Sequence, residues 1–404
     1  MPPNHESISV RLRSLYERTV LMTQRFTSGK FWVLKVLLLC VFFSIFLSGG
    51  LDFNLFEGGN YPESYFKKID HPLLDVTKIY ALNSHDSNMN FRLTVPVILH
   101  VLGIHWRWTL PLLTIAATCL ILVLSCMAAC RLTGDRVCGC FIALNVAATY
   151  VGSFNFIAYY DAIAICQLAL AGLPGMPWWG RGLLVFTASF TDERAFVASG
   201  LLLVASFFLS GQRTTWLARL RNPDFLAVGF AMFAYGVARL ALIKFGGLSQ
   251  VTGATGPGAL VGNFIFLHPS VWFSLEGGWL LFLLAMGVLF ARGQFFEGAT
   301  FVLATLFYLA FALMIGDVMR STVFIFPMLF ICLKILQQNE PLPGLRIYCL
   351  LAFLISAIGG NYNVYVGKIT WFQPLLIHWI QAGAGVIYDW IYPLLPHTMP
   401  RQHG

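Results

Sequence analysis

Uninterrupted apolar runs constrain the fold of this chain more than any motif in it. Residues 108–130 contain no charged side chain, and such a run is long enough for a helix to cross a bilayer, which takes ~20 residues. In lipid only α-helices and closed β-barrels satisfy every backbone hydrogen bond. The strands of a barrel alternate apolar and polar residues, and these runs do not alternate. The sequence therefore predicts an all-α, polytopic transmembrane helical bundle of about 11–12 helices.

Composition agrees with the membrane class. The chain of 404 residues is 58% hydrophobic and 11% charged, whereas a soluble domain has about one quarter charged residues. We expect a single transmembrane domain over residues 1–404. The nine cysteines lie in or beside apolar runs, so they are expected to be buried and reduced, without disulfides.

The distribution of basic residues predicts the orientation. The net charge is +8, but most Lys and Arg residues lie in short loops between apolar runs, which is the positive-inside pattern and not a nucleic-acid surface. Residues 1–30 form a basic arm, which we place in the cytoplasm, and residues 31–48 form the first anchoring helix. Residues 50–90 then form a long acidic loop on the outer side, the first outer loop.

Two segments leave the topology open. Residues 91–104 are too short to cross a bilayer, so we expect a re-entrant or surface helix on the outer side. In the rival topology this segment crosses, and residues 182–210 form one long helix. Residues 369–395 are rich in tryptophan and fit either a final span or an interfacial helix. The remaining spans are predicted near residues 109–130, 137–153, 157–174, 182–191, 195–211, 225–243, 279–291, 297–316, 321–336 and 346–359.

A few charged residues interrupt the apolar sequence, and each is a candidate functional residue, because an ionisable group at membrane depth is costly unless it is paired or lines a wet cavity. Successive helical residues point about 100° apart, so the three charges at 192–194 need at least one partner from elsewhere. The predicted orientation collects these charges on the outer side as one substrate-binding site: Asp161, Asp192, Glu193, Arg194, Lys244, Asp317 and Arg320.

Arginines suggest what this site would bind. Arg320 precedes a helix start, where free backbone N–H groups favour anions, and Arg92 follows the first outer loop. Together with Arg194 and Lys244 they suit a phosphate or pyrophosphate head group. The alternative is a purely structural role, in which Arg320 pairs with Asp317, three residues away on the same helix face.

The order of these motifs resembles the GT-C superfamily of integral-membrane glycosyltransferases, most of all its short bacterial members without a periplasmic domain. The likeness covers residues 31–359 and is carried by the acidic first outer loop, then FRLTVP at 91–96, TDERA at 191–195 and GDVMR at 316–320. The resemblance implies a polyprenyl-phosphate sugar donor, Arg320 as a phosphate ligand, and a catalytic base in the first outer loop.

For that base, the resemblance implies Asp52 first and Glu57 second. Asp52 departs from many GT-C members, because no second acidic residue follows it. His85 with Asp86 is an alternative, in which the imidazole is the base and the carboxylate orients it. No metal-ligand motif is visible, and a requirement for a divalent metal stays open.

Three functions remain after these steps. The first is a glycosyltransferase of the bacterial inner membrane, which transfers a sugar from the lipid donor to an envelope glycan or lipid acceptor. The second is a transporter or flippase of a lipid-linked or anionic substrate, although no repeated halves are visible. The third is a non-catalytic partner in a membrane assembly, in which the charges only hold helices together.

Overall fold

The computed structural model describes residues 8–48, 63–80, 86–106, 108–153, 160–209, 215–249, 260–261, 263–264, 267–315, 318–359, 361–365 and 368–372. The first half contains α1 Ile8–Phe26, α2 Trp32–Ser48, α4 Glu63–Asp70, η1 Val76–Lys78, η2 Asp86–Phe91, α5 Thr94–Val101, α6 Thr109–Thr133, α7 Arg136–Ala148, η3 Tyr150–Gly152, α8 Asp161–Ala171, α9 Trp178–Thr191 and α10 Glu193–Phe208. The second half contains α11 Trp216–Leu220, α12 Pro223–Lys244, α14 Leu267–Leu275, α15 Gly278–Ala291, α16 Phe295–Leu313, α17 Val318–Thr322, η5 Val323–Ile325, α18 Pro327–Asn339, α19 Leu342–Gly359, β1 Asn361–Tyr365 and β2 Lys368–Phe372.

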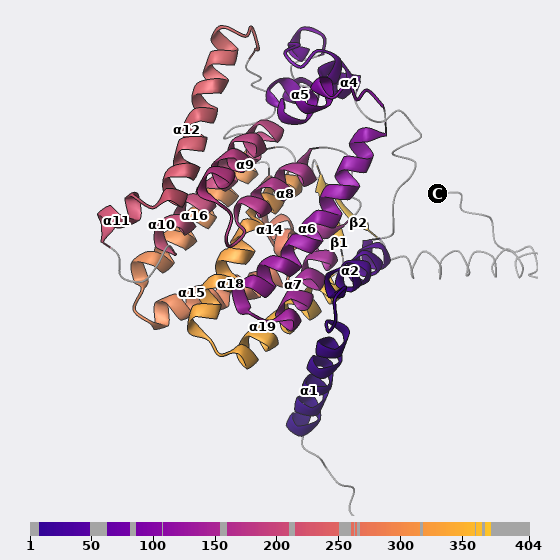
Figure 1. Ribbon diagram of the computed structural model, residues 1–404, viewed down its shortest axis with the longest axis vertical. Helices are drawn as coiled ribbons and strands as arrows, with labels where there is room; N and C mark the ends of the chain where they lie inside the picture. Colours follow the sequence, from indigo (N-terminus) through magenta and orange to yellow (C-terminus); the bar gives the residue numbers. More distant parts are fainter. Residues whose placement is uncertain are drawn as a thin grey trace, which may run out of the picture.

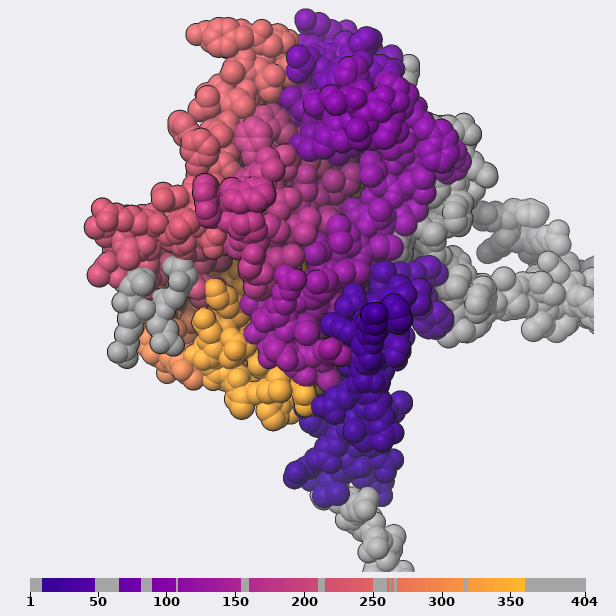
Figure 2. All heavy atoms as spheres, in the orientation of Figure 1, coloured from indigo at the N-terminus to yellow at the C-terminus, as the bar shows by residue number. Residues whose placement is uncertain are grey.

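The helices pack side by side as one bundle, with α4 and α5 at one end and α1 projecting from the other (Figure 1). The space-filling view shows α1 standing clear of the bundle (Figure 2). Neighbours in the chain pack closely, as α6 with α7 and α8 with α9, and α19 returns to pack on α7. Helix α18 is central, because 94% of the most apolar window of Val318–Asn339 is buried inside the protein.

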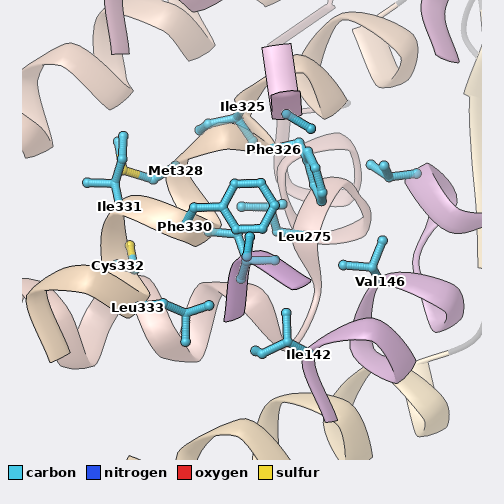
Figure 3. Close-up of a cluster of buried hydrophobic side chains, with 14 of the residues drawn as sticks. Ile142, Val146, Leu275, Ile325, Phe326, Met328, Phe330, Ile331, Cys332 and Leu333 are labelled. Atoms are coloured by element: carbon cyan, nitrogen blue, oxygen red, sulfur yellow. The ribbon is translucent and has the colours of Figure 1, made fainter. Parts of the chain in front are cut away.

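The length and hydropathy of the helices make this an integral membrane protein. Among the described residues, five helices are long and apolar enough to cross a bilayer, or six if the bent pair α14–α15 counts as one span. The all-α, polytopic bundle is confirmed. Two predicted spans were too long, since α7 has 13 residues and α8 has 11. Side chains from α7, α14 and α18 meet in one part of the buried core (Figure 3).

A small lobe at one end of the bundle contains α4, η1, η2 and α5. It has its own buried cluster around Tyr65, Ile69 and Met89. Helix α5 has 8 residues, about 12 Å at 1.5 Å per residue, so it is far too short to cross. The side of the membrane on which it lies stays a prediction.

The chain breaks between α9 and α10, which contradicts the single long helix of the rival topology. Asp192 takes an extended conformation, with φ −152° and ψ 131°, and its side chain accepts a hydrogen bond from the Arg194 backbone N–H. Aspartate is a preferred N-cap for this reason: its carboxylate satisfies an N–H that has no partner within the helix.

A two-stranded antiparallel hairpin follows α19 and corrects one prediction. Strand β1 pairs with β2 in a register that places Asn361 opposite Phe372 and Tyr365 opposite Lys368. Residues 368–372, at the start of the expected final helix, are therefore a strand. Both strands are rich in β-branched and aromatic residues, which favour a pleated conformation. The rest of the segment to residue 395 lies outside the described residues.

Candidate functional site

Six charged side chains meet where α8 and α10 begin, and we call them the ion-pair cluster. Asp161 is the first residue of α8, Asp192 caps α10, and Glu193 begins α10. Helix N-termini carry a partial positive charge that stabilises nearby carboxylates, so both helices favour acids at these positions. Two arginines of the cluster come from other elements, Arg92 from the segment before α5 and Arg320 from α17. The members of the cluster are Arg92, Asp161, Asp192, Glu193, Arg194 and Arg320.

Arg194 forms the centre of the cluster. Its Nε and Nη2 lie 2.7 Å from the two carboxylate oxygens of Asp192, a two-pronged contact within one helix turn. The same Nη2 lies 2.5 Å from Asp161 Oδ1. The guanidinium also stacks 5.0 Å from the centroid of the Phe324 ring, a favourable position for a cation. The sequence predicted that the charges at 192–194 need a partner from elsewhere in the chain, and Asp161 is such a partner for Arg194.

Asp161 bridges two arginines. One oxygen accepts from Arg194, and Arg320 Nε lies 2.6 Å from the other. The bridge joins α8, α10 and α17, which are distant in sequence. Nearby, the Tyr308 hydroxyl of α16 donates to the Ser321 carbonyl and anchors α17 to the neighbouring helix. Arg320 thus has a carboxylate partner other than Asp317, which lies outside the described residues.

Arg92 lies at the edge of the cluster next to the lobe. Its Nη2 lies 3.0 Å from Asp192 Oδ2 and its Nε 3.4 Å from Glu193 Oε2. Its third nitrogen, Nη1, is buried and has no acceptor among the described residues. A buried donor left without an acceptor costs about 1–3 kcal/mol. Glu193 is the most open member, with 34% of its side chain exposed.

The charges of the cluster balance, with three arginines against three carboxylates. Such a balance is needed because an isolated ion at low dielectric is very costly. At the Arg92 edge, one donor has no acceptor among the described residues and the Glu193 carboxylate is partly exposed. At this edge the cluster can accept a further anionic oxygen.

The other candidate residues are not brought into the cluster. Lys244 is exposed at the end of α12, with its ammonium 5.5 Å from the centroid of the Phe245 ring, and it makes no ion pair among the described residues. Asp86 begins η2, but its side chain is outside the described part of the structure. Asp52, Glu57 and Asp317 lie in segments outside the described residues.

Sequence reasoning missed a polar network that holds the lobe together. The Asp75 carboxylate accepts hydrogen bonds from Thr77, from Asn90 at 2.8 Å and from Ser249 at 2.7 Å. Lys68 is fully buried and donates to two backbone carbonyls, and burial lowers its pKa to about 8 against the opposing effect of Asp75. The spacing of Asp75 and Thr77 is a local capping signal, but the bond from Ser249 spans 174 residues.

Acid is expected to weaken this lobe through Asp75. Burial raises the pKa of this carboxyl, but hydrogen bonds from Thr77, Ser249 and Asn90 outweigh it and lower the pKa to about 2 from an ordinary 3.8. The stabilisation is therefore present above about pH 4 and is lost as the pH falls to about 2. Thermal unfolding between pH 5 and pH 2 should show a steeper loss for the wild type than for Asp75→Asn. Equal slopes would contradict this role.

Among the described residues, no group of three or more His, Cys, Asp or Glu side chains is placed to hold a metal ion. The cluster carboxylates are instead neutralised by arginines, as described above.

No protein-family model, curated protein or solved structure matches this chain.

Proposed function

We propose that the protein is an integral-membrane glycosyltransferase, which transfers a sugar from a polyprenyl-phosphate donor to an envelope glycan or lipid acceptor. The proposal places it in the bacterial inner membrane, with its N-terminus in the cytoplasm and the ion-pair cluster on the outer side. It rests on the resemblance of its motif order to the GT-C superfamily and on one observation in particular. That observation is the buried Nη1 of Arg92, which lacks an acceptor among the described residues.

A phosphate oxygen would supply that acceptor. Arg92 Nη1 can donate a charge-assisted hydrogen bond to a phosphate oxygen, and such bonds are about twice as strong as neutral ones. The other two nitrogens of Arg92 face Asp192 and Glu193, which fix the guanidinium in place before a ligand arrives. Holding the donor this way costs little reorganisation and orients its phosphate as a leaving group.

The transfer itself would be an inverting displacement. The acceptor hydroxyl oxygen forms the new bond to the anomeric carbon, and its proton passes to a carboxylate of the first outer loop. The bond between that carbon and the phosphate oxygen breaks, and the phosphate leaves with the electron pair. Asp52 is the first candidate for the base, with Glu57 and Asp86 as the others.

Donor binding tests the role of Arg92. Arg92→Lys retains a positive charge for Asp192 but removes the forked Nη1 donor, so we expect binding of a polyprenyl phosphate to weaken about tenfold or more with little change in thermal stability. Binding is measured on the purified protein in lipid nanodiscs by displacement of a fluorescent polyprenyl phosphate.

Arg194→Lys is the matched control for this experiment. Its guanidinium nitrogens already contact Asp161 and Asp192, so the same substitution should lower stability more than the Arg92 variant does. If Arg92→Lys loses stability and binding in equal proportion, or binds normally, the cluster only holds helices together and the proposal fails.

Turnover tests the candidate base. Asp52→Asn should lower sugar transfer by about 10²- to 10⁴-fold while the lipid donor still binds, and single-turnover transfer of a labelled sugar measures this directly. A dead Glu57→Gln or Asp86→Asn beside an active Asp52→Asn would move the base to that residue. Full activity in all three variants, or movement of labelled lipid across the bilayer without transfer, would refute this mechanism.

A further inference from the structure

A second polar site lies at the opposite end of the helices that carry the ion-pair cluster. It is a cavity of about 300 Å³, between the end of α8, the last turns of α10 and the first two turns of α18. On α10, Ser206 lines the cavity and Arg194 belongs to the cluster. These residues are 12 positions apart, which is about 18 Å along a helix, so the cavity is separate from the cluster.

Two cations and one carboxylate determine the charge of the cavity wall. Arg181, Asp224 and Lys334 all line it. Arg181 Nη1 lies 2.6 Å from Asp224 Oδ2, but Arg181 Nε is buried without an acceptor among the described residues. Lys334 Nζ donates to the Leu209 carbonyl at 2.7 Å and forms no ion pair in the described part of the chain. The charge on the wall is therefore net positive.

The rest of the cavity wall is largely apolar, with side chains such as Leu202, Phe330 and Ile331. An apolar wall lowers the local dielectric, and this increases the attraction between the two cations and an anion. Asn222 is fixed at the rim by a hydrogen bond to the Ser206 carbonyl. The volume is at the lower end of the range for ligand sites, about 300–1,000 Å³, and suits a small ligand or a single head group.

We propose that this cavity binds a phosphate group, held by the Lys334 ammonium and by the Nε of Arg181, which has no acceptor among the described residues. Arginine and lysine are the side chains that recognise phosphate, one as a fork and the other as a point charge. The phosphate can belong to a soluble phosphorylated molecule or to a lipid head group that enters from the bilayer. The site is independent of the proposed function, since it shares no residue with the cluster.

Binding of inorganic pyrophosphate tests the soluble source. Titration calorimetry on the purified protein in phosphatidylcholine nanodiscs should give saturable binding. Lys334→Met removes the charge at nearly constant shape and should weaken binding about tenfold or more. Asp224→Asn removes the competing carboxylate and should strengthen it. Lys35→Met is the matched control, because the Lys35 ammonium also donates to backbone carbonyls, those of Phe26 and Ser28, and lies away from the cavity.

A lipid source is tested in a second arm with phosphatidic acid. Native mass spectrometry of protein released from nanodiscs that contain phosphatidic acid should show retained lipid in the wild type and in Lys35→Met, but less in Lys334→Met. Lys334-dependent binding in either arm supports the proposal and identifies the source. If neither arm depends on Lys334, and Asp224→Asn changes nothing, the cavity binds no phosphate and the pair between Arg181 and Asp224 serves only to join α9 to α12.

Discussion

Replacing Asp161 by Asn is expected to lower the free energy of unfolding by about 3–5 kcal/mol, the usual cost of breaking a buried ion pair from one side. Asp161 neutralises both Arg194 and Arg320, and its loss leaves three arginines facing two carboxylates. The shape of the side chain is retained, so the effect reports charge and not packing. Thermal or denaturant unfolding in detergent measures it.

A double variant separates this explanation from a simple packing defect. Asp161→Asn combined with Arg320→Met restores the charge balance, and part of the lost stability should return, as a double-mutant cycle would reveal. Asp70→Asn serves as the control, because Asp70 pairs with His105 at an exposed position, where ion pairs contribute about 0–1 kcal/mol. Strictly additive losses in the double variant would count against a coupled cluster.

Replacing Gly277 by Ala is also expected to destabilise the fold strongly. The added Cβ would lie 1.8 Å from the Ala352 carbonyl oxygen and 2.6 Å from its carbon. These are backbone atoms of α19 and cannot swing aside, so the break between α14 and α15 must move. Overpacking in a well-packed interior typically costs about 1–3 kcal/mol or more. Yield of folded protein and thermal midpoint are the measurements.

Gly287 on α15 provides the matched control. Nothing lies within 4 Å of a Cβ added there, so Gly287→Ala should be neutral or stabilise the helix by about 0.5–1 kcal/mol. The two substitutions are chemically identical and ten residues apart. If they behave alike, the close approach of α15 to α19 at Gly277 is not a constraint on the fold.

Local rules explain most of what could be predicted from the sequence. The run from 108 to 130 appears as α6, and the charges at 192–194 mark a helix break, because Asp192 caps α10 within its own segment. Hydropathy and capping act over a few residues, so they can be read without a structure. The convergence of Arg92, Asp161 and Arg320 was partly predictable too, since buried charges require partners.

Long-range contacts account for what was missed. The hydrogen bond between Asp75 and Ser249 depends on how two distant loops meet, and nothing in the local spacing encodes it. Likewise, Asp161 pairs with Arg320 across 159 residues, a contact that the local spacing around Arg320 does not predict. The hairpin at 361–372 was missed because hydropathy favoured a helix where strand pairing was possible.

The ion-pair cluster also imposes an order on biosynthesis. As the chain is made, Arg92, Asp161 and residues 192–194 emerge first, and at that stage two arginines face three carboxylates. The missing positive charge arrives only with Arg320, more than a hundred residues later. The charges of the cluster therefore cannot balance until α17 has been made, and a chain that ends before Arg320 leaves one buried carboxylate without its counter-charge.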